Sequence, residues 1–207
     1  MSPGPAKSFA PEVALVQARD LFWRRGYDGV GIREIETELG ISRKSLYDTF
    51  GSKRELFLRA LEQYTDSVIA RICTGLTDGR GTALENLERV LGKLQTHHAS
   101  PESRGCLLGV AMGQAGSDDE ELAEHLRSYL TRLERAFETA LKAAQADGSV
   151  RADVNPKDSA RQPAALTQGM ALVGRRTDPR ALQRSIVRAA LDGLRRPPRP
   201  PTPPPRA

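Results

Sequence analysis

Apolar residues recur at helical spacing in every long segment of this 207-residue chain, and this periodicity limits the possible folds more than any other feature. No run of alternating β-branched residues bounded by turn residues occurs. The sequence therefore predicts an all-α protein. The clearest amphipathic stripe belongs to the longest predicted helix and comprises Leu122, Leu126, Tyr129, Leu133, Phe137, Ala140, Leu141 and Ala144.

The first sixty residues or so are divided into four helical segments. The first is predicted from Pro11 to Gly26 and the second from Gly31 to Leu39, because proline favours a helix start and glycine a helix end. Ser42 is a predicted N-cap of the third, and Ser52 of a fourth that runs towards Ile72. Two short helices joined by a glycine-containing turn are typical of a helix-turn-helix unit.

Five further helices are predicted from their start signals. Two capping boxes pair a hydroxyl residue with a glutamate three positions later, and two Asx-Pro pairs place proline at a first helical position. A short apolar helix from Cys106 to Ala115 lacks such a signal. The starts with a signal are Thr82 with Glu85, Ser117 with Glu120, Asn155 with Pro156, and Asp178 with Pro179; the first of these helices should end near Thr96 and the second near Asp147.

Proline occurs inside one predicted helix and is frequent at the C-terminal end of the chain. Pro163 falls about seven residues into the penultimate predicted helix, where proline removes a hydrogen bond at a cost of about 3 kcal/mol. That helix should therefore either start later or bend. Residues 196–207 are rich in proline and arginine and have no apolar residues to bury, so we expect a disordered tail; residues 1–8 are expected to be a flexible N-terminus.

The basic character of the chain comes from its C-terminal end. The net charge is +5, but residues 175–207 carry nine arginines and two aspartates, so the preceding residues are slightly acidic overall. The high pI therefore does not by itself indicate a nucleic-acid surface. No stretch reaches the roughly 18 to 20 apolar residues of a membrane span, and the N-terminus lacks the apolar region of a signal peptide. We expect a cytoplasmic protein with no membrane contact.

The third predicted helix combines an apolar face with a basic one. With Leu46 and Phe50 facing inward, positions 43, 44, 45, 47 and 49 face outward. Arg43 and Lys44 then lie in the first turn, the end that a recognition helix presents to the major groove. An arginine can bind guanine with two hydrogen bonds, and Ser45 can bind phosphate or base. Tyr47 is predicted to donate to phosphate while its ring packs inward.

The segment "LFWRRGYDGVGIREIETELGISRKSLYDTFGSKRELF" resembles the N-terminal domain of the TetR family of bacterial transcriptional repressors. Lys53 is the first residue of the next predicted helix, and a helix N-terminus together with an ammonium group favours a phosphate. The family resemblance implies two further DNA contacts, Arg33 and Thr49. The matching positions are Phe22, Gly26, Tyr27, Ile35, Gly40, Ile41, Ser42, Leu46, Tyr47, Phe50, Ser52, Lys53, Leu56 and Phe57.

This resemblance implies the organisation of the chain. Residues 9–58 are expected to form the DNA-binding domain, with the helix-turn-helix at 31–50, and residues 59–195 a helical domain that binds a ligand and dimerises. The expected partners are a near-palindromic double-stranded operator, a small-molecule inducer and a second copy bound through the last two helices. Departures from the family pattern include Val30-Gly31 in place of a capping hydroxyl residue, and the acidic Glu36 and Glu38.

Candidate ligand residues lie in the second domain, although each could equally be ordinary core. Bundle interiors often hold apolar ligands. Cys106 is the sharper candidate, either as a thiol that senses oxidants or electrophiles or as a structural cysteine. His97, His98, His125 and the cysteines show no familiar metal-site spacing, and no catalytic motif occurs, so neither a cofactor nor an enzyme is expected. The apolar candidates are Leu107, Met112, Tyr129, Phe137 and Met170.

Overall fold

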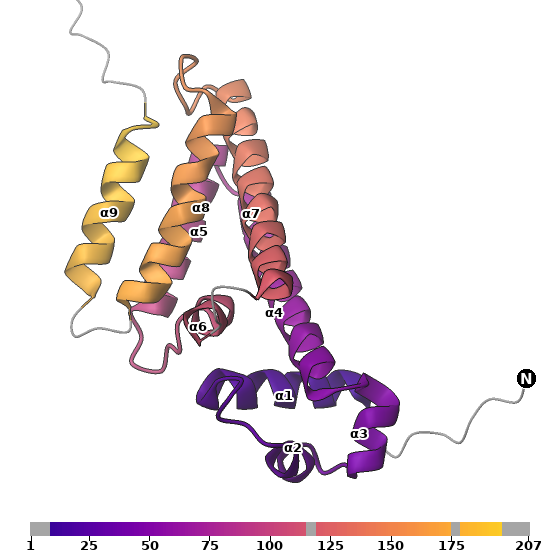
Figure 1. The fold of residues 1–207 in the computed structure, drawn as a ribbon. Coiled ribbons are helices and arrows are strands. Elements are labelled where there is room, and N and C mark those ends of the chain that lie inside the picture. Colours follow the sequence, from indigo (N-terminus) through magenta and orange to yellow (C-terminus); the bar gives the residue numbers. More distant parts are fainter. Residues whose placement is uncertain (1–8, 115–118, 175–178, 196–207) are drawn as a thin grey trace, which may run out of the picture.

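The computed structural model describes residues 9–114, 119–174 and 179–195, and these residues are almost entirely helical (Figure 1). Their only β-structure is an isolated bridge between Val150 and Arg195. None of the described helices is both long and apolar enough to cross a membrane. The helices are α1 (Pro11–Arg25), α2 (Ile32–Leu39), α3 (Arg43–Phe50), α4 (Lys53–Leu76), α5 (Ala83–His98), α6 (Leu107–Gln114), α7 (Glu120–Ala146), α8 (Pro156–Val173) and α9 (Arg180–Asp192).

Helices α1, α2 and α3 form a small unit with the first turns of α4, below the other helices in Figure 1. Its centre is aromatic: the ring centroids of Phe22 and Phe57 lie 5.1 Å apart, and Tyr27 packs 4.9 Å from Phe57. Leu46 and Phe50 of α3 are buried against this centre, as their spacing predicts. Burial of one face of α3 leaves its other face to solvent.

Helix caps fix the ends of α2 and α3. Gly40 ends α2 with a φ of 63°, in the left-handed region that glycine adopts without strain. Ser42 then caps α3, its hydroxyl accepting from the Ser45 N–H at 3.1 Å, and Ser52 caps α4 by accepting from Glu55 at the same distance. These contacts confirm the predicted helix-turn-helix, and they hold α3 at a defined angle to α2.

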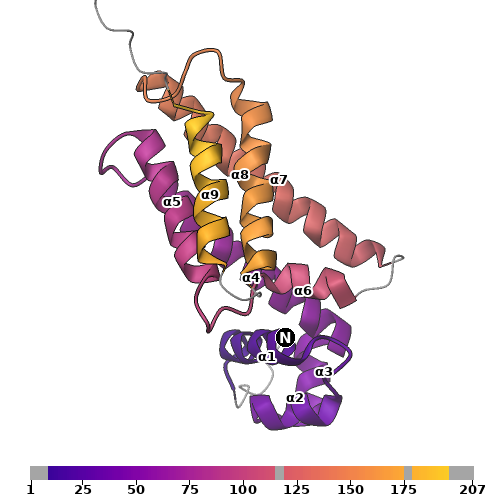
Figure 2. The ribbon, with the colours of Figure 1, turned by 90° about the vertical axis from the view of Figure 1, so that its left-hand side faces the viewer.

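The remaining helices form a larger bundle that α4 connects to the small unit (Figure 2). Helix α4 packs on α5 and α7, α7 packs along α8, and α9 covers α5 and α8. Arg195, just after α9, forms an ion pair with Glu88 of α5 at 3.0 Å. Helix α4 belongs to both parts. A movement of the other bundle helices relative to α4 therefore changes the position of α3 relative to the bundle.

Most predicted helix ends agree with the structure, and two starts are wrong. The capping box of Thr82 and Glu85 forms, and α5 extends two residues further than predicted, to His98. Helix α7 starts at Glu120 with Asp119 as N-cap, because the Asp119 carboxylate accepts from Leu122 at 3.1 Å; the predicted cap Ser117 lies outside the described residues.

At α9, proline occupies the N-cap position instead of the first helical position. Pro179 is the N-cap residue and Arg180 is the first residue of α9, so the predicted start is one residue early. The predicted N-cap, Asp178, lies outside the described residues. Asn155 does cap α8, its side-chain oxygen accepting from Lys157 at 3.0 Å. Three further predictions fall outside the described part of the chain: a flexible N-terminus at residues 1–8, a helical Ala115, and a disordered tail at residues 196–207.

Pro163 lies inside α8, which runs without interruption from Pro156 to Val173. Of the two predicted outcomes for this helix, the later start is therefore wrong. Pro163 is buried, so its ring packs towards the bundle. Burial of its apolar ring offsets part of the lost hydrogen bond.

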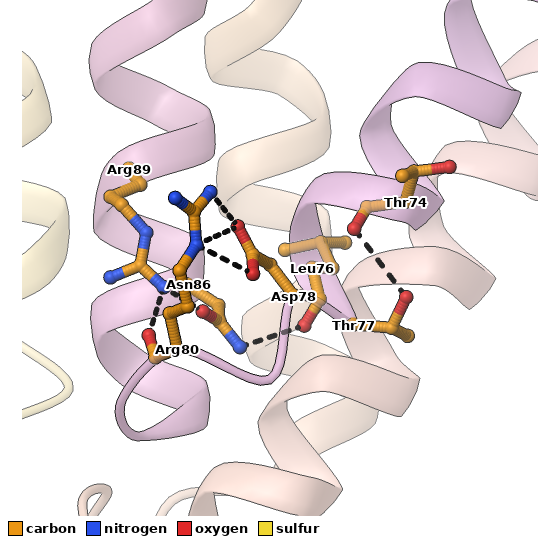
Figure 3. A network of polar contacts seen from close by, with 7 residues as sticks. All are labelled: Thr74, Leu76, Thr77, Asp78, Arg80, Asn86 and Arg89. Atoms are coloured by element: carbon orange, nitrogen blue, oxygen red, sulfur yellow. Dashed lines mark hydrogen bonds and ion pairs between the residues drawn. The ribbon is translucent and has the colours of Figure 1, made fainter.

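A polar network closes the end of the bundle furthest from α3, at the turn from α4 to α5 (Figure 3). Asp78 and Arg80 form an ion pair at 2.6 Å, and Arg89 donates to the Arg80 carbonyl and to the Asn86 side chain. Asn86 is buried and donates to the carbonyl of Leu76, the last residue of α4, at 3.3 Å. The Asn86 side chain therefore links the first turn of α5 to the last residue of α4 by a hydrogen bond.

Replacing Asn86 with alanine should lower the free energy of unfolding by about 1 to 3 kcal/mol, because the Leu76 carbonyl loses its buried donor. Thr77→Ala serves as a control: Thr77 is exposed, and its loss should change stability by less than about 0.5 kcal/mol. Urea unfolding followed by circular dichroism measures both values. Equal effects of the two substitutions would contradict the assigned role of Asn86.

Candidate nucleic-acid interface and ligand cavity

The outward face of α3 carries the predicted DNA contacts in an accessible arrangement. Arg43 and Lys44 are exposed, and Ser45 and Thr49 are half-buried. No ion pair within the described residues involves either cation. The Ser45 hydroxyl lies 3.0 Å from that of Ser42. Two unpaired cations in the first turn of a helix that is fixed on its other side form a surface suited to a polyanion.

Tyr47 corrects one detail of the sequence-based prediction, because its ring does not pack inward. The residue is 41% exposed, and the guanidinium carbon of Arg43 lies 5.9 Å from its ring centroid. The position follows α3's buried Leu46 by one residue, which turns the side chain by about 100° away from the core. Tyr47 thus belongs to the same exposed surface as Arg43.

The two predicted contacts outside α3 lie on neighbouring helices. Arg33 is exposed on α2. Lys53 is half-buried at the start of α4, and its ammonium nitrogen lies 4.1 Å from the ring centroid of Tyr27. Burial lowers the pKa of Lys53, and the nearby carboxylates of Asp28 and Glu34 partly oppose this shift. Lys53 is therefore held in place by the aromatic centre of the small unit.

Two carboxylates of α2 are neutralised by the last turn of α1. Glu38 forms an ion pair with Arg24 at 2.6 Å, and Glu34 forms one with Arg25. Glu34 also accepts from the N–H of Gly31, the N-cap residue of α2, at 2.8 Å, so the start of α2 has a side-chain contact without a capping hydroxyl. Glu38 departs from the family pattern and would repel DNA, but its negative charge is compensated because Arg24 lies beside it.

A cavity of about 200 Å³ lies where α1, α4, α5, α7 and α8 meet. Its walls include Arg19 and Trp23 from α1, so the small unit forms part of the cavity. The Trp23 ring packs edge-on against Tyr64 at 5.0 Å, and its indole N–H donates to the Arg104 carbonyl at 3.2 Å. The cavity therefore contacts both parts of the protein.

Only two of the six candidate ligand residues line this cavity. Cys106 and Tyr129 do so. Leu107, Phe137 and Met170 are at most 1% exposed, and Met112 is half-buried; none of these four lines it. Leu107, Phe137 and Met170 therefore belong to the core, and this cavity does not support the predicted ligand contacts of the four residues. Polar wall residues that the sequence did not single out include Tyr64, Thr167 and Gln168.

The polar groups of the cavity are buried and interact with one another. Tyr64 shares a hydrogen bond with the Cys106 thiol, and burial raises the pKa of the Tyr64 hydroxyl well above its usual value. Burial likewise raises the pKa of Tyr129, to which Gln168 donates at 3.4 Å. Both tyrosines are therefore neutral at pH 7 and can donate hydrogen bonds to a ligand.

His98 differs from its sequence-based interpretation. A histidine at the end of a helix usually caps it and, when charged, interacts favourably with the helix dipole. The residue is 7% exposed, and burial, with a contribution from His97, lowers its pKa to about 4. His98 is therefore neutral at pH 7, and its Nδ1 has no hydrogen-bond partner among the described residues. The described residues contain no group of three metal-ligating side chains.

Comparison with known proteins agrees with this architecture. Residues 14–60 match the family model "Bacterial regulatory proteins, tetR family", and residues 83–190 match "Tetracyclin repressor-like, C-terminal domain". The chain belongs to the TetR family. It is a helix-turn-helix transcriptional regulator.

Individual TetR relatives support the assignment along most of the chain. The uncharacterised regulator YezE of Bacillus subtilis is 29% identical over 72% of this chain and 77% of its own length. The transcriptional repressor BdcR of Escherichia coli is 41% identical, but over only 38% of this chain and 40% of its own. A solved structure of the regulator CifR, a cysteine mutant in complex with 26-base-pair operator DNA, is 28% identical, with a TM-score of 0.79 over 92% of this chain and all of its own.

Proposed function

We propose that this TetR-family regulator is a repressor that binds a near-palindromic double-stranded operator as a homodimer. The observation that carries the proposal is the exposed pair Arg43 and Lys44 in the first turn of α3, which forms no ion pair with the described part of the chain. Structures of CifR with operator DNA and the repressor name of BdcR support it. The chain acts as a regulator, not as an enzyme, and works in the cytoplasm.

In this proposal residues 9–58 are the DNA-binding domain and residues 59–195 the ligand-binding and dimerisation domain. Helix α3 enters the major groove, where Arg43 binds a guanine edge and Lys44 a phosphate or a base. The other contacts position the domain on the phosphate backbone. The proposed DNA-binding residues are Arg33, Arg43, Lys44, Ser45, Tyr47, Thr49 and Lys53.

Selection of binding sites from a random DNA library by the purified protein tests this proposal. We expect enrichment of a near-palindrome whose half-sites are about one helical turn apart, roughly 34 to 36 Å, because two copies of α3 would enter successive major grooves. The Arg43→Ala variant should lose the preference at one position of each half-site. Failure to enrich any motif with the wild-type protein would contradict the proposal.

Dimerisation through α8 and α9 is supported by apolar residues that the bundle leaves uncovered. Leu172 at the end of α8 is 73% exposed, and Leu182 of α9 is 51% exposed. Ala165 and Gly169 precede Leu172 on the same face of α8 and are small enough for a second helix to approach closely. Symmetric burial of these faces between two copies would remove the leucines from water.

Leu172→Glu should weaken the dimer at least about tenfold, because a leucine side chain contributes roughly 1.5 to 3 kcal/mol when fully buried and a buried carboxylate is unfavourable. Val13→Glu introduces the same charge at an apolar residue of α1 that is 58% exposed, and it should leave the dimer intact. Sedimentation equilibrium measures the dissociation constants. A dimer unaffected by Leu172→Glu would contradict this interface.

We further propose that a small molecule in the 200 Å³ cavity regulates DNA binding. The cavity wall combines residues of α1 with residues of the bundle, and α4 joins the two parts. A ligand that favours one arrangement of α4 changes the distance between the two copies of α3. A coupling free energy of about 1 to 3 kcal/mol would lower operator affinity about 5- to 150-fold.

A thiol-based sensor is the second candidate, and the position of Cys106 in the cavity wall favours it. A small electrophile that enters the cavity can reach the sulfur, and the Tyr64 hydroxyl lies within hydrogen-bond reach. A quinone would add to Sγ, and the thiol proton would end on the reduced quinone ring. Cys73, the other cysteine of the chain, is exposed and serves as a control.

Cys106→Ser separates the thiol sensor from the reversible ligand site. If the thiol is the sensor, a quinone that releases the wild-type protein from DNA should leave this variant bound, while Cys73→Ser should respond like the wild type. Fluorescence anisotropy of labelled operator DNA measures the release. Release of Cys106→Ser by the same quinone concentration would rule out the thiol.

A further inference from the structure

The charged side chains that line the cavity are all positive among the described residues. Two arginines and two histidines line the cavity, and no aspartate or glutamate does so among the described residues. Arg19 is engaged by the adjacent Asp20 at 2.8 Å. Arg71 is exposed and takes part in no ion pair within the described residues. Arg71 is thus the cation that is available to a ligand.

Hydrogen-bond donors surround this cation. Arg71 and Tyr129 both line the cavity, Arg71 from α4 and Tyr129 from α7. The side-chain amide of Gln168 points its nitrogen at the Tyr129 hydroxyl. His98, 7% exposed, is also part of the wall, and its Nδ1 has no hydrogen-bond partner in the described ranges of the chain. Neutral donors beside an arginine are the groups that bind carboxylate oxygens.

Part of the wall is apolar, and the volume of the cavity limits the size of the ligand. Ile72, Leu94 and Ala171 line it together with the Trp23 ring. A volume of about 200 Å³ corresponds to roughly seven water molecules at about 30 Å³ each. Pockets that hold drug-sized ligands have volumes of about 300 to 1,000 Å³. The space therefore suits a short carbon chain or a single small ring.

We propose that the cavity binds a small organic monocarboxylate, with its carboxylate at Arg71 and Tyr129 and its carbon chain against Trp23 and Leu94. The proposal rests on the proposed function, since it names the class of ligand for the regulatory cavity. It also assigns a role to Trp23, a residue of the DNA-binding domain, as a direct ligand contact. The bound monocarboxylate therefore contacts α1 through its carbon chain and the bundle through its carboxylate.

Calorimetric titration of the full-length protein without DNA tests the ligand class. The probes are butyrate, benzoate, the uncharged butyramide, and inorganic phosphate, all at constant ionic strength. Trp23, the only tryptophan of the chain, reports occupancy through its fluorescence. The variant is Arg71→Gln, and the matched control is Arg135→Gln, which removes an exposed arginine of α7 that does not line the cavity.

We expect butyrate or benzoate to bind and to change Trp23 fluorescence, with butyramide and phosphate much weaker. Arg71→Gln should weaken the carboxylate about 10- to 100-fold, as expected for the loss of a charge-assisted hydrogen bond, and Arg135→Gln should not. Equal binding of butyramide, no binding of either carboxylate, equal binding of phosphate, or indifference to Arg71→Gln would each overturn the proposal. Because no DNA is present, these outcomes are independent of whether the protein binds an operator.

Discussion

Replacing Phe22 with alanine is expected to lower the free energy of unfolding by about 3 to 5 kcal/mol, the range for a large aromatic side chain removed from a core. Phe22 is 1% exposed, and its ring packs against Phe57 at 5.1 Å and Tyr27 at 6.2 Å. The neighbouring side chains are already buried in the core, and such surroundings relax only partly into the space that a removed ring leaves. A loss of this size is a large share of the roughly 5 to 15 kcal/mol that stabilise a typical protein.

Urea unfolding, followed by circular dichroism, measures the effect of Phe22→Ala. Val13→Ala on the same helix is the matched control, because Val13 is 58% exposed and its truncation should change stability by less than about 0.5 kcal/mol. Lys53 lies over Tyr27, so the aromatic centre also positions a proposed DNA contact. A loss below about 1 kcal/mol for Phe22→Ala would show that this centre is not what holds the unit together.

The Arg43→Ala/Lys44→Ala double variant is expected to show the largest loss of operator affinity. A bidentate arginine–guanine contact contributes about 1 to 3 kcal/mol of discrimination, which is about 5- to 150-fold, and the lost lysine contact adds to this. If Lys44 binds phosphate, its removal should also reduce the slope of affinity against salt concentration by about 1. Both residues are exposed, so the fold should be unaffected.

Fluorescence anisotropy on the selected operator measures this loss at two salt concentrations. Arg135→Ala provides the control, since it removes one positive charge from α7, outside the proposed interface. The double variant should still bind non-specific DNA weakly through Arg33 and Lys53. An operator affinity within twofold of the wild type would contradict the assignment of α3 as the recognition helix.

The sequence predicts the helix-turn-helix well because its signals are local. Ser42 and Ser52 cap the helices that follow them, and Leu46 and Phe50 lie on the buried face. At α7 the signal was ambiguous, because Ser117 and Asp119 are both capping residues and the helix uses Asp119. Tyr47 was misplaced for a related reason: periodicity gives the direction of a side chain but not how much of it a neighbour covers.

The cavity could not be predicted because its residues come from five helices that are far apart in the sequence. Cys106 and Tyr129 were found as candidates through their residue types, but Leu107, Phe137 and Met170 have equally suitable types and fill the core instead. Nothing local in the sequence shows that His98 is buried and neutral, since the pair His97-His98 resembles an ordinary helix end. The role proposed for Arg71 depends on its place in the cavity wall with Tyr129, and these two residues are far apart in the sequence.

The most direct test of the central claim is the affinity of the wild-type protein for labelled DNA from upstream of its own gene, compared with a scrambled sequence of equal length. Anisotropy titrations at two salt concentrations give both affinities. We expect the natural sequence to bind at least about 10³-fold more tightly, with two protein chains per site and affinity that falls steeply with salt. Equal, weak binding to natural, scrambled and selected DNA would contradict the account of this protein as an operator-binding repressor.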